Sequence, residues 1–83
     1  MRVVVYSTSR CPFCKMAKDF LNDHNIRYEV VDVGEDKEAA REMIEKSGQM
    51  GVPVIEIIGN KGKNEIIIGF DVNRLKKTLK IKD

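Results

Sequence analysis

The sequence has few cysteines and histidines, little net charge and no long apolar segment. It contains two cysteines, one histidine and no tryptophan, so a single chain offers at most three of the cysteine and histidine ligands from which structural zinc sites are built. A structural zinc site usually needs four ligands, and a membrane-spanning helix needs roughly 20 apolar residues. The formal net charge of +2 predicts no strong attraction to nucleic acid or to an anionic membrane. These absences argue against a structural zinc protein, a membrane protein and a nucleic-acid-binding protein.

The basic residues near the C-terminus do not change this expectation. They are Arg74, Lys76, Lys77, Lys80 and Lys82. We interpret them as the solvated end of a helix, where cations lie favourably against the negative pole of the helix dipole. The stretch has no aromatic residues on which bases would stack, so we predict no nucleic-acid partner.

The length of 83 residues allows one small domain but not two, and we expect a single domain over residues 1–83. At the N-terminus, only four apolar residues, Val3–Tyr6, precede the polar segment Ser7–Arg10. This is not the pattern of a signal peptide. We therefore expect a cytoplasmic protein with no membrane partner, in a compartment where structural disulfides rarely persist.

Hydrophobic periodicity predicts seven elements of secondary structure in the order β-α-β-α-β-β-α. Strands are expected at residues 2–7, 27–33, 54–58 and 64–68, and a turn at residues 59–62 joins the last two in a hairpin. Helices are expected from Pro12 to about residues 22–25, over residues 34–48, and after Asp71. The first half forms a right-handed parallel βαβ unit. We predict an α/β fold with a four-stranded mixed sheet and helices on both faces.

The buried face of each helix is predicted from apolar residues at helical spacing. The three sets are Phe13, Met16, Ala17, Phe20 and Leu21; Ala39, Ala40, Met43, Ile44 and Ser47; and Val72, Leu75 and Leu79. Glu35, Asp36 and Glu38 are expected in the first turn of the second helix, near its positive dipole end. Gly48 is expected to close that helix in the left-handed conformation, and Asp71 to cap the last one.

The two cysteines, Cys11 and Cys14, lie where the first strand becomes the first helix. A thiol at a helix N-terminus has a lowered pKa because the helix dipole favours an anion there, and Arg10 and Lys15 are expected to stabilise the thiolate further. We predict that Cys11 is the attacking thiol, because the thiolate is the species that attacks a disulfide. Cys14, one turn along the same helix face, is predicted to be the resolving thiol.

Metal binding is the alternative explanation for this cysteine pair. Cys11 and Cys14 are two zinc ligands at most, and His24 is expected over two turns away, in an ordinary surface or helix-end role. A metal or iron–sulfur cluster shared between two chains stays open on cysteine count alone.

Val52-Pro53 precedes the third predicted strand and allows two interpretations. A proline at this place can simply mark the start of a strand. Alternatively, a cis bond beside the thiols would expose the backbone of Val52 to an extended peptide substrate, which would pair with it like a strand.

Three segments together carry a family resemblance over essentially the whole chain. They are Cys11-Pro12-Phe13-Cys14 after the first strand, Gly51-Val52-Pro53 before the third, and Gly69-Phe70-Asp71 before the last helix. The arrangement resembles the glutaredoxins of the thioredoxin-fold superfamily, most closely the short bacterial glutaredoxin-like proteins. Thioredoxins proper have a tryptophan where this chain has Arg10.

The resemblance implies a monomeric disulfide oxidoreductase with roles in electron transport and cell redox homeostasis. It would reduce protein disulfides and glutathione mixed disulfides, with glutathione as co-substrate, glutathione reductase as supporting enzyme and no tightly bound cofactor. The implied glutathione groove contains Phe13 as a wall, Gln49 against a carboxylate, and the backbone of Val52 before Pro53. Near the last helix, it contains Gly69, Phe70 and Asp71 around the γ-glutamyl end.

Several positions depart from the family pattern and suggest a second hypothesis. Thr8 replaces a frequent lysine, Gly51 a usual threonine, Phe70 a glycine and Val72 a frequent acidic residue. Phe70 is expected either to narrow the γ-glutamyl side of the groove or to be an ordinary core aromatic. Gly51 and Gly69-Phe70 suggest a redoxin that thioredoxin reductase reduces and that serves a protein such as ribonucleotide reductase. A binding module without turnover is the remaining alternative.

Overall fold

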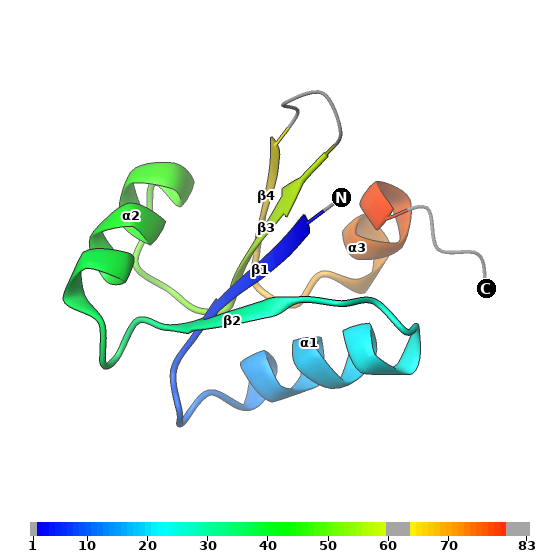
Figure 1. The fold of residues 1–83 in the computed structure, drawn as a ribbon, viewed down its shortest axis with the longest axis horizontal. Coiled ribbons are helices and arrows are strands. Elements are labelled where there is room, and N and C mark those ends of the chain that lie inside the picture. The colour runs from blue at the N-terminus through cyan, green and yellow to red at the C-terminus, as the bar shows by residue number, and fades with distance from the viewer. Residues whose placement is uncertain (1, 60–63, 80–83) are drawn as a thin grey trace.

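The computed structural model describes residues 2–59 and 64–79 (Figure 1). Their elements are β1 (Arg2–Ser7), α1 (Pro12–Asp23), β2 (Glu29–Asp32), α2 (Lys37–Ser47), β3 (Val54–Ile58), β4 (Asn64–Ile68) and α3 (Val72–Leu79). The predicted element order is confirmed. Most of the predicted turn at 59–62, and Lys80 and Lys82 of the basic segment, lie outside the described residues. No helix in the described part of the chain is long and apolar enough to cross a membrane.

The four strands form one mixed sheet in the order β2-β1-β3-β4. β1 is parallel to β2 and antiparallel to β3, and β3 is antiparallel to β4. In this register Ser7 pairs with Asp32, Tyr6 with Val54, and Val54 with Ile68. The segments that follow β1, β2 and β4 and the segment that precedes β3 therefore meet at one end of the sheet.

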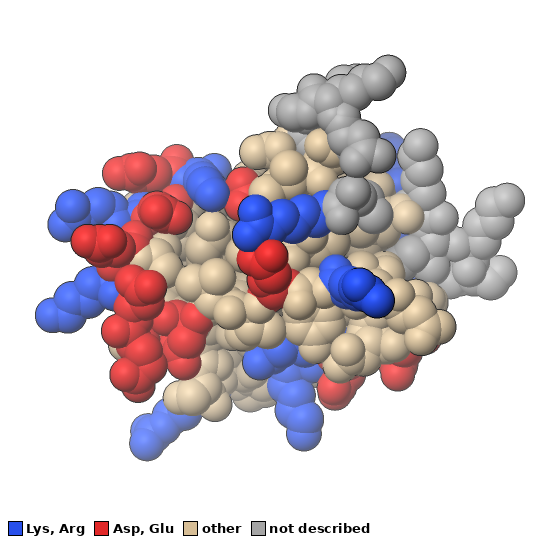
Figure 2. Space-filling view, in the orientation of Figure 1, with Lys and Arg blue, Asp and Glu red and all other residues tan. Residues whose placement is uncertain are grey.

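Helices cover both faces of the sheet, as predicted. One apolar cluster joins the sheet to α1 and α3; its buried residues are Val3, Val5, Ala17, Leu21, Ile55, Ile57, Ile67, Leu75 and Leu79. The other lies under α2 and contains Val4, Tyr6, Met43 and Val54. Successive residues of β1 alternate between these clusters because strand side chains point to opposite faces. Figure 2 shows acidic and basic side chains side by side on the surface over α2, opposite its buried face.

The predicted buried face of α1 was partly wrong. Cys14, Ala17 and Leu21 are its buried residues, whereas Phe13 is 59% exposed and Met16 is 48% exposed. The helix begins at Pro12 with Cys14 facing the sheet, and this rotates the buried stripe away from Phe13 and Met16. In α2, Ala39 and Met43 are buried as predicted, but Ile44 is 37% exposed.

The second helix begins later than predicted, at Lys37 rather than residue 34. Asp36 is its N-cap, and the Asp36 carboxylate accepts the N–H groups of Glu38 and Ala39, each at 3.1 Å. Before it, Asp32 Oδ1 accepts the N–H groups of Gly34 and Glu35, so these residues belong to a turn. Gly48 closes the helix at φ 74°, as predicted.

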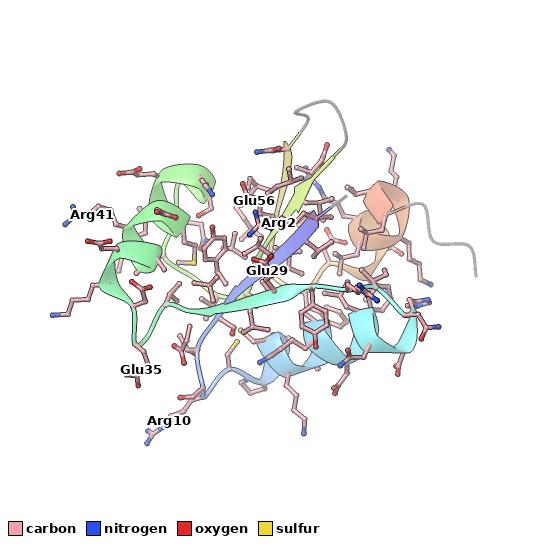
Figure 3. All side chains as sticks on the ribbon, in the orientation of Figure 1. Arg2, Arg10, Glu29, Glu35, Arg41 and Glu56 are labelled. Atoms are coloured by element: carbon pink, nitrogen blue, oxygen red, sulfur yellow. The ribbon has the colours of Figure 1, made fainter. Side chains whose placement is uncertain are left out.

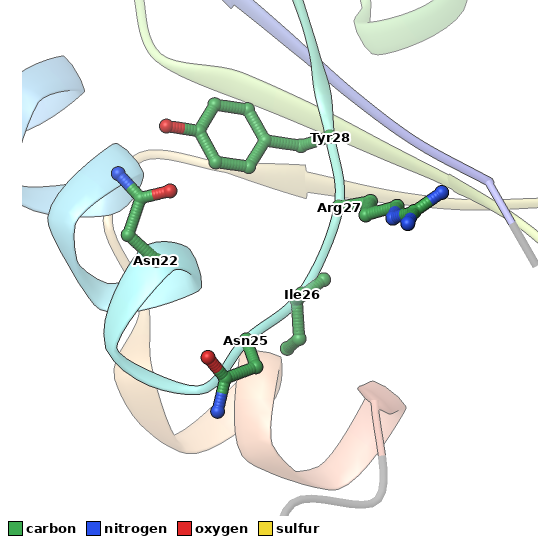
Figure 4. A pocket seen from close by; sticks show the side chains of 5 residues that line it. All are labelled: Asn22, Asn25, Ile26, Arg27 and Tyr28. Carbon is green, nitrogen blue, oxygen red and sulfur yellow. The ribbon is translucent and has the colours of Figure 1, made fainter.

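β2 is shorter than the predicted strand over residues 27–33 and lies at the sheet edge. Chain reversal after α1 passes through Asn25 at φ 57°, a left-handed conformation that asparagine tolerates. The side chains around this reversal surround a surface hollow (Figure 4), lined by Asn22, Asn25, Ile26, Arg27 and Tyr28. Strand pairing with β1 starts only at Glu29, whose carboxylate lies 2.7 Å from the Arg2 guanidinium (Figure 3).

Candidate active site

Cys11 is the N-cap residue of α1. Its backbone is extended, at φ −107° and ψ 107°, and Pro12 is the first residue of the helix. Cys11 Sγ accepts the backbone N–H of Cys14 at 3.1 Å, so the sulfur satisfies one of the N–H groups that a helix leaves unpaired at its start. This end of the helix carries the positive pole of its dipole, which is a favourable position for a thiolate.

Cys14 differs from Cys11 because it is fully buried, whereas Cys11 is half-buried, and both are free thiols. Burial, followed by the hydrogen bond to Cys11, raises the pKa of Cys14 from 9.0 to about 11. The backbone of Thr8 and the charge of Lys18 act in the opposite direction on this pKa. At neutral pH, Cys14 is therefore a protonated thiol held behind a more accessible sulfur.

Arg10 and Lys15 lie next to the cysteines in sequence, but their side chains are exposed. Figure 3 shows Arg10 extending away from the fold. Within residues 2–59 and 64–79, no hydrogen bond joins either cation to a cysteine sulfur. The effects of Thr8 and Lys18 on Cys14 were not predicted from the sequence. The position of Lys18, four residues after Cys14 on the same helix face, is the signal that would have identified it.

The segment before β3 and the segment after β4 are directly connected. The Val52–Pro53 peptide bond is cis, and Pro53 is buried. The carbonyl of Pro53 accepts the N–H of Gly69 at 2.8 Å, where Gly69 adopts φ 79°. Glycine suits this conformation because it has no Cβ to resist a positive φ. The sheet register brings both segments to the end of β1 from which the chain leads to Cys11.

Gln49 makes both of its side-chain hydrogen bonds to a single residue, Gly51. The Gly51 N–H donates to Gln49 Oε1 at 2.6 Å, and Gln49 Nε2 donates to the Gly51 carbonyl at 2.9 Å. These bonds fix the orientation of the amide and leave only the second Nε2 N–H to meet a glutathione carboxylate as the family resemblance predicts.

Phe70 packs toward the core. It is half-buried against the cluster under α1 and α3, and its ring meets the ring of Phe20 edge to face, with centroids 6.1 Å apart. This arrangement fits the expectation of a core aromatic better than that of a groove wall. Phe20 also contacts His24, with ring centroids 4.5 Å apart, and His24 is the C-cap residue of α1. Phe13, in contrast, exposes most of its ring beside the cysteines.

Asp71 caps α3, as predicted. Its Oδ1 accepts the N–H of Arg74 at 3.1 Å, and its carbonyl accepts the N–H of Leu75 at 2.9 Å. The carboxylate therefore already occupies part of the helix N-terminus that the resemblance assigns to the γ-glutamyl end of glutathione. A surface hollow adjoins it, lined by Glu65, Asp71, Asn73, Arg74 and Lys77.

The described residues contain no group of three or more histidine, cysteine, aspartate or glutamate side chains that could hold a metal ion. Cys11 and Cys14 are both free thiols. A buried thiol and an accessible thiol, linked through the first turn of a helix, can form and open a disulfide with each other.

Comparisons with known proteins point to the same chemistry. A family model described as Glutaredoxin matches residues 3–61. An uncharacterized glutaredoxin-like 8.6 kDa protein from the rubredoxin operon of Clostridium pasteurianum is 40% identical over 77 residues, which cover 93% of this chain and 96% of that protein. The glutaredoxin-like protein NrdH of Lactococcus lactis is 38% identical over 53 residues, covering 64% of this chain and 72% of that protein.

Among solved structures, a mutant of the thioredoxin-like protein BC3987 matches with a TM-score of 0.85 at 30% identity. The match covers 98% of this chain and 97% of that one. Since the family model spans most of the chain and the clostridial relative matches nearly all of it, this redox protein belongs to the glutaredoxin family and has its thioredoxin-like fold.

Proposed function

We propose that the protein reduces protein disulfides and glutathione mixed disulfides through a dithiol cycle at Cys11 and Cys14. The observation that carries this proposal is the 3.1 Å hydrogen bond from the Cys14 N–H to Cys11 Sγ. It holds the more accessible sulfur at the positive end of a helix, with the second sulfur one turn behind it.

In the first step, the Cys11 thiolate attacks one sulfur of the substrate disulfide. A Cys11–substrate disulfide forms, the substrate disulfide breaks, and the leaving thiolate takes a proton from solvent. In the second step, Cys14 loses its proton and attacks Cys11 Sγ. The Cys11–Cys14 disulfide forms, and the remaining substrate sulfur leaves as a thiolate and is protonated. The substrate gains two electrons and two protons, and the protein becomes oxidised.

The pKa of Cys14 supports this order of steps. Burial is the main cause that raises that pKa, and the hydrogen bond with Cys11 and the charge of Cys11 add to it. When Cys11 is consumed in a mixed disulfide, the contribution of its charge is lost, whereas burial still acts on Cys14. The resolving thiol is therefore more readily deprotonated after the first attack than before it.

We propose glutathione as the co-substrate that returns the oxidised protein to its dithiol form, in the cytosol and with no tightly bound cofactor. Membership of the glutaredoxin family supports this, and the start of α3, near Gly69, is where the resemblance places the γ-glutamyl end. Val52, beside Pro53, has a backbone suited to pair with the cysteinyl unit of glutathione.

A second candidate is a redoxin that thioredoxin reductase reduces directly and that donates electrons to a protein such as ribonucleotide reductase. Two observations favour it: the Gln49 amide is bonded to Gly51, and Phe70 packs against Phe20 rather than forming part of an open groove. The match to a glutaredoxin-like protein NrdH also supports it.

A comparison of electron donors tests both candidates. The oxidised protein is mixed with NADPH and either glutathione with glutathione reductase or thioredoxin reductase alone, and NADPH consumption is followed. Turnover of a small glutathione mixed disulfide with the first system supports the leading proposal, and its absence rejects it. Failure of thioredoxin reductase to reduce the Cys11–Cys14 disulfide rejects the second candidate.

A further inference from the structure

The segment that leads from α2 to Pro53 is fixed by a short series of hydrogen bonds. The Ser47 hydroxyl donates to the Met43 carbonyl at 2.6 Å, and it accepts the Gln49 N–H at 3.4 Å. Gln49 then uses both ends of its side-chain amide to hold the N–H and the carbonyl of Gly51. The last turn of α2 is in this way connected to the residue that precedes Val52 and Pro53.

Only glycine fits at position 51 in this arrangement. A Cβ atom on residue 51 would lie 2.7 Å from Gln49 Oε1, and Cβ atoms in proteins essentially never come within 3.0 Å of such a neighbour. The crowded atom is the end of a flexible side chain, so a larger residue at position 51 would displace the Gln49 amide and leave the backbone in place. Gln49 and Gly51 therefore depend on each other, and we refer to them as the Gln49–Gly51 pair.

We propose that Gln49 is a positioning residue for the Gly51–Pro53 segment, and that the Gln49–Gly51 pair sets the substrate preference of the site. While the amide is bonded to Gly51, its oxygen and one of its two Nε2 N–H groups are in use, so only the second N–H is left for a carboxylate on a small substrate such as glutathione. The same bonds hold the backbone beside Val52 in one conformation, which favours an extended protein segment that pairs with it. This inference rests on the proposed dithiol activity.

Hydrogen exchange at the Gly51 amide tests the pair without any activity measurement. Gly51 is exposed, so its N–H exchanges slowly only if the bond to Gln49 protects it. We expect exchange in Gln49→Ala to be about tenfold faster, the upper range of what one net hydrogen bond supplies. Met50→Ala, in the same segment, should exchange like the native protein.

Substrate kinetics test the preference. Turnover of a small glutathione mixed disulfide is measured with glutathione and glutathione reductase, and turnover of insulin disulfides with dithiothreitol as reductant. Gln49→Ala should raise the KM for the glutathione disulfide by no more than about threefold, because at most one N–H of the amide is free in the native protein. Gly51→Ala frees the whole amide and should lower this KM by about threefold or more, and the double variant should match Gln49→Ala. Both single variants should lose insulin turnover by a similar factor.

Two results would overturn the inference. One is a Gly51 amide that exchanges equally fast in the native protein and in Gln49→Ala. The other is a rise of about tenfold or more in the KM for the glutathione disulfide in Gln49→Ala with no change in Gly51→Ala, which would make Gln49 a direct glutathione ligand. Failure of the proposed function would look different, because a native protein that reduces no disulfide would still show the protected Gly51 amide.

Discussion

The backbone N–H of Cys14 donates to Cys11 Sγ at 3.1 Å, so the buried cysteine positions the accessible one. This bond exists because Cys11 takes the N-cap position that serine, threonine or aspartate usually occupies. Cys14, at the other end of the bond, has no exposed surface and a pKa raised to about 11. The two thiols of the Cys11-Pro12-Phe13-Cys14 motif are therefore chemically distinct.

The stability of the protein should fall at high pH because of Cys14. Its pKa is 9.0 ordinarily and about 11 in the folded state, so between these values the unfolded chain binds fewer protons than the folded one. By linkage, the free energy of unfolding decreases as pH rises from 9 toward 11, and Cys14 contributes its full stabilisation below that window. Urea denaturation of the reduced protein at pH 8 and pH 10.5 measures the loss.

Cys14→Ser is the matched control, since lysine and tyrosine residues also titrate in this range. The native protein should lose more stability than the variant over the same pH interval. Equal losses would mean that the thiol is not held in its neutral form by burial.

Cys11→Ser should leave less than roughly a thousandth of either reductase activity, because loss of an attacking nucleophile removes the covalent route. Cys14→Ser should keep activity on glutathione mixed disulfides, where a second glutathione can release Cys11, but should lose reduction of protein disulfides. Parallel assays on a small glutathione mixed disulfide and on insulin measure this separation. An equal loss of both activities in Cys14→Ser would contradict the assigned roles.

The Phe20–Phe70 contact should contribute to stability rather than to catalysis. Edge-to-face aromatic pairs are worth about 0.5–1.5 kcal/mol beyond simple burial. A double-mutant cycle with Phe20→Leu and Phe70→Leu, followed by urea denaturation, should give a coupling energy of about 1 kcal/mol. In addition, Phe70→Leu should leave the KM for a glutathione mixed disulfide unchanged. A large change in this KM would show that Phe70 contributes to the glutathione groove.

Lys46 should be important for stability because it covers a buried carboxylate in the sheet. Glu56 is 3% exposed, and Lys46 Nζ lies 3.0 Å from its carboxylate and 3.3 Å from the Tyr6 hydroxyl. Removing one partner of a buried ion pair costs about 3–5 kcal/mol of stability. The loss of stability in Lys46→Met should lie near or below the lower end of this range, since the lysine side chain is 39% exposed.

Glu56→Gln combined with Lys46→Met should recover much of that loss, because the neutral amide needs no cation. Thermal denaturation of the two variants measures the recovery. If the double variant is less stable than Lys46→Met alone, the cost does not arise from an uncompensated charge.

The fold was predictable because its elements have local signals. The strands are rich in β-branched residues, Gly48 ends α2, and Asp71 precedes α3. The three motif segments also follow from the sequence, and the register explains why they meet. The buried face of α1 was not predictable from apolar spacing. Phe13 and Met16 continue the apolar stripe of the sequence, but the helix that starts after the Cys11 N-cap turns both side chains outward. The Gln49–Gly51 pair depends on the direction of the chain after Gly48, for which neither residue type gives a signal.

Trapping of the mixed disulfide tests the division of roles between Cys11 and Cys14 most directly. Reduced Cys14→Ser is mixed with a protein disulfide substrate, quenched in acid and analysed by non-reducing electrophoresis and mass spectrometry. We predict an adduct linked through Cys11, released by dithiothreitol, and no comparable adduct with reduced Cys11→Ser. Equal adduct formation through Cys14 in Cys11→Ser would show that the buried thiol attacks substrates itself, and would contradict the assignment.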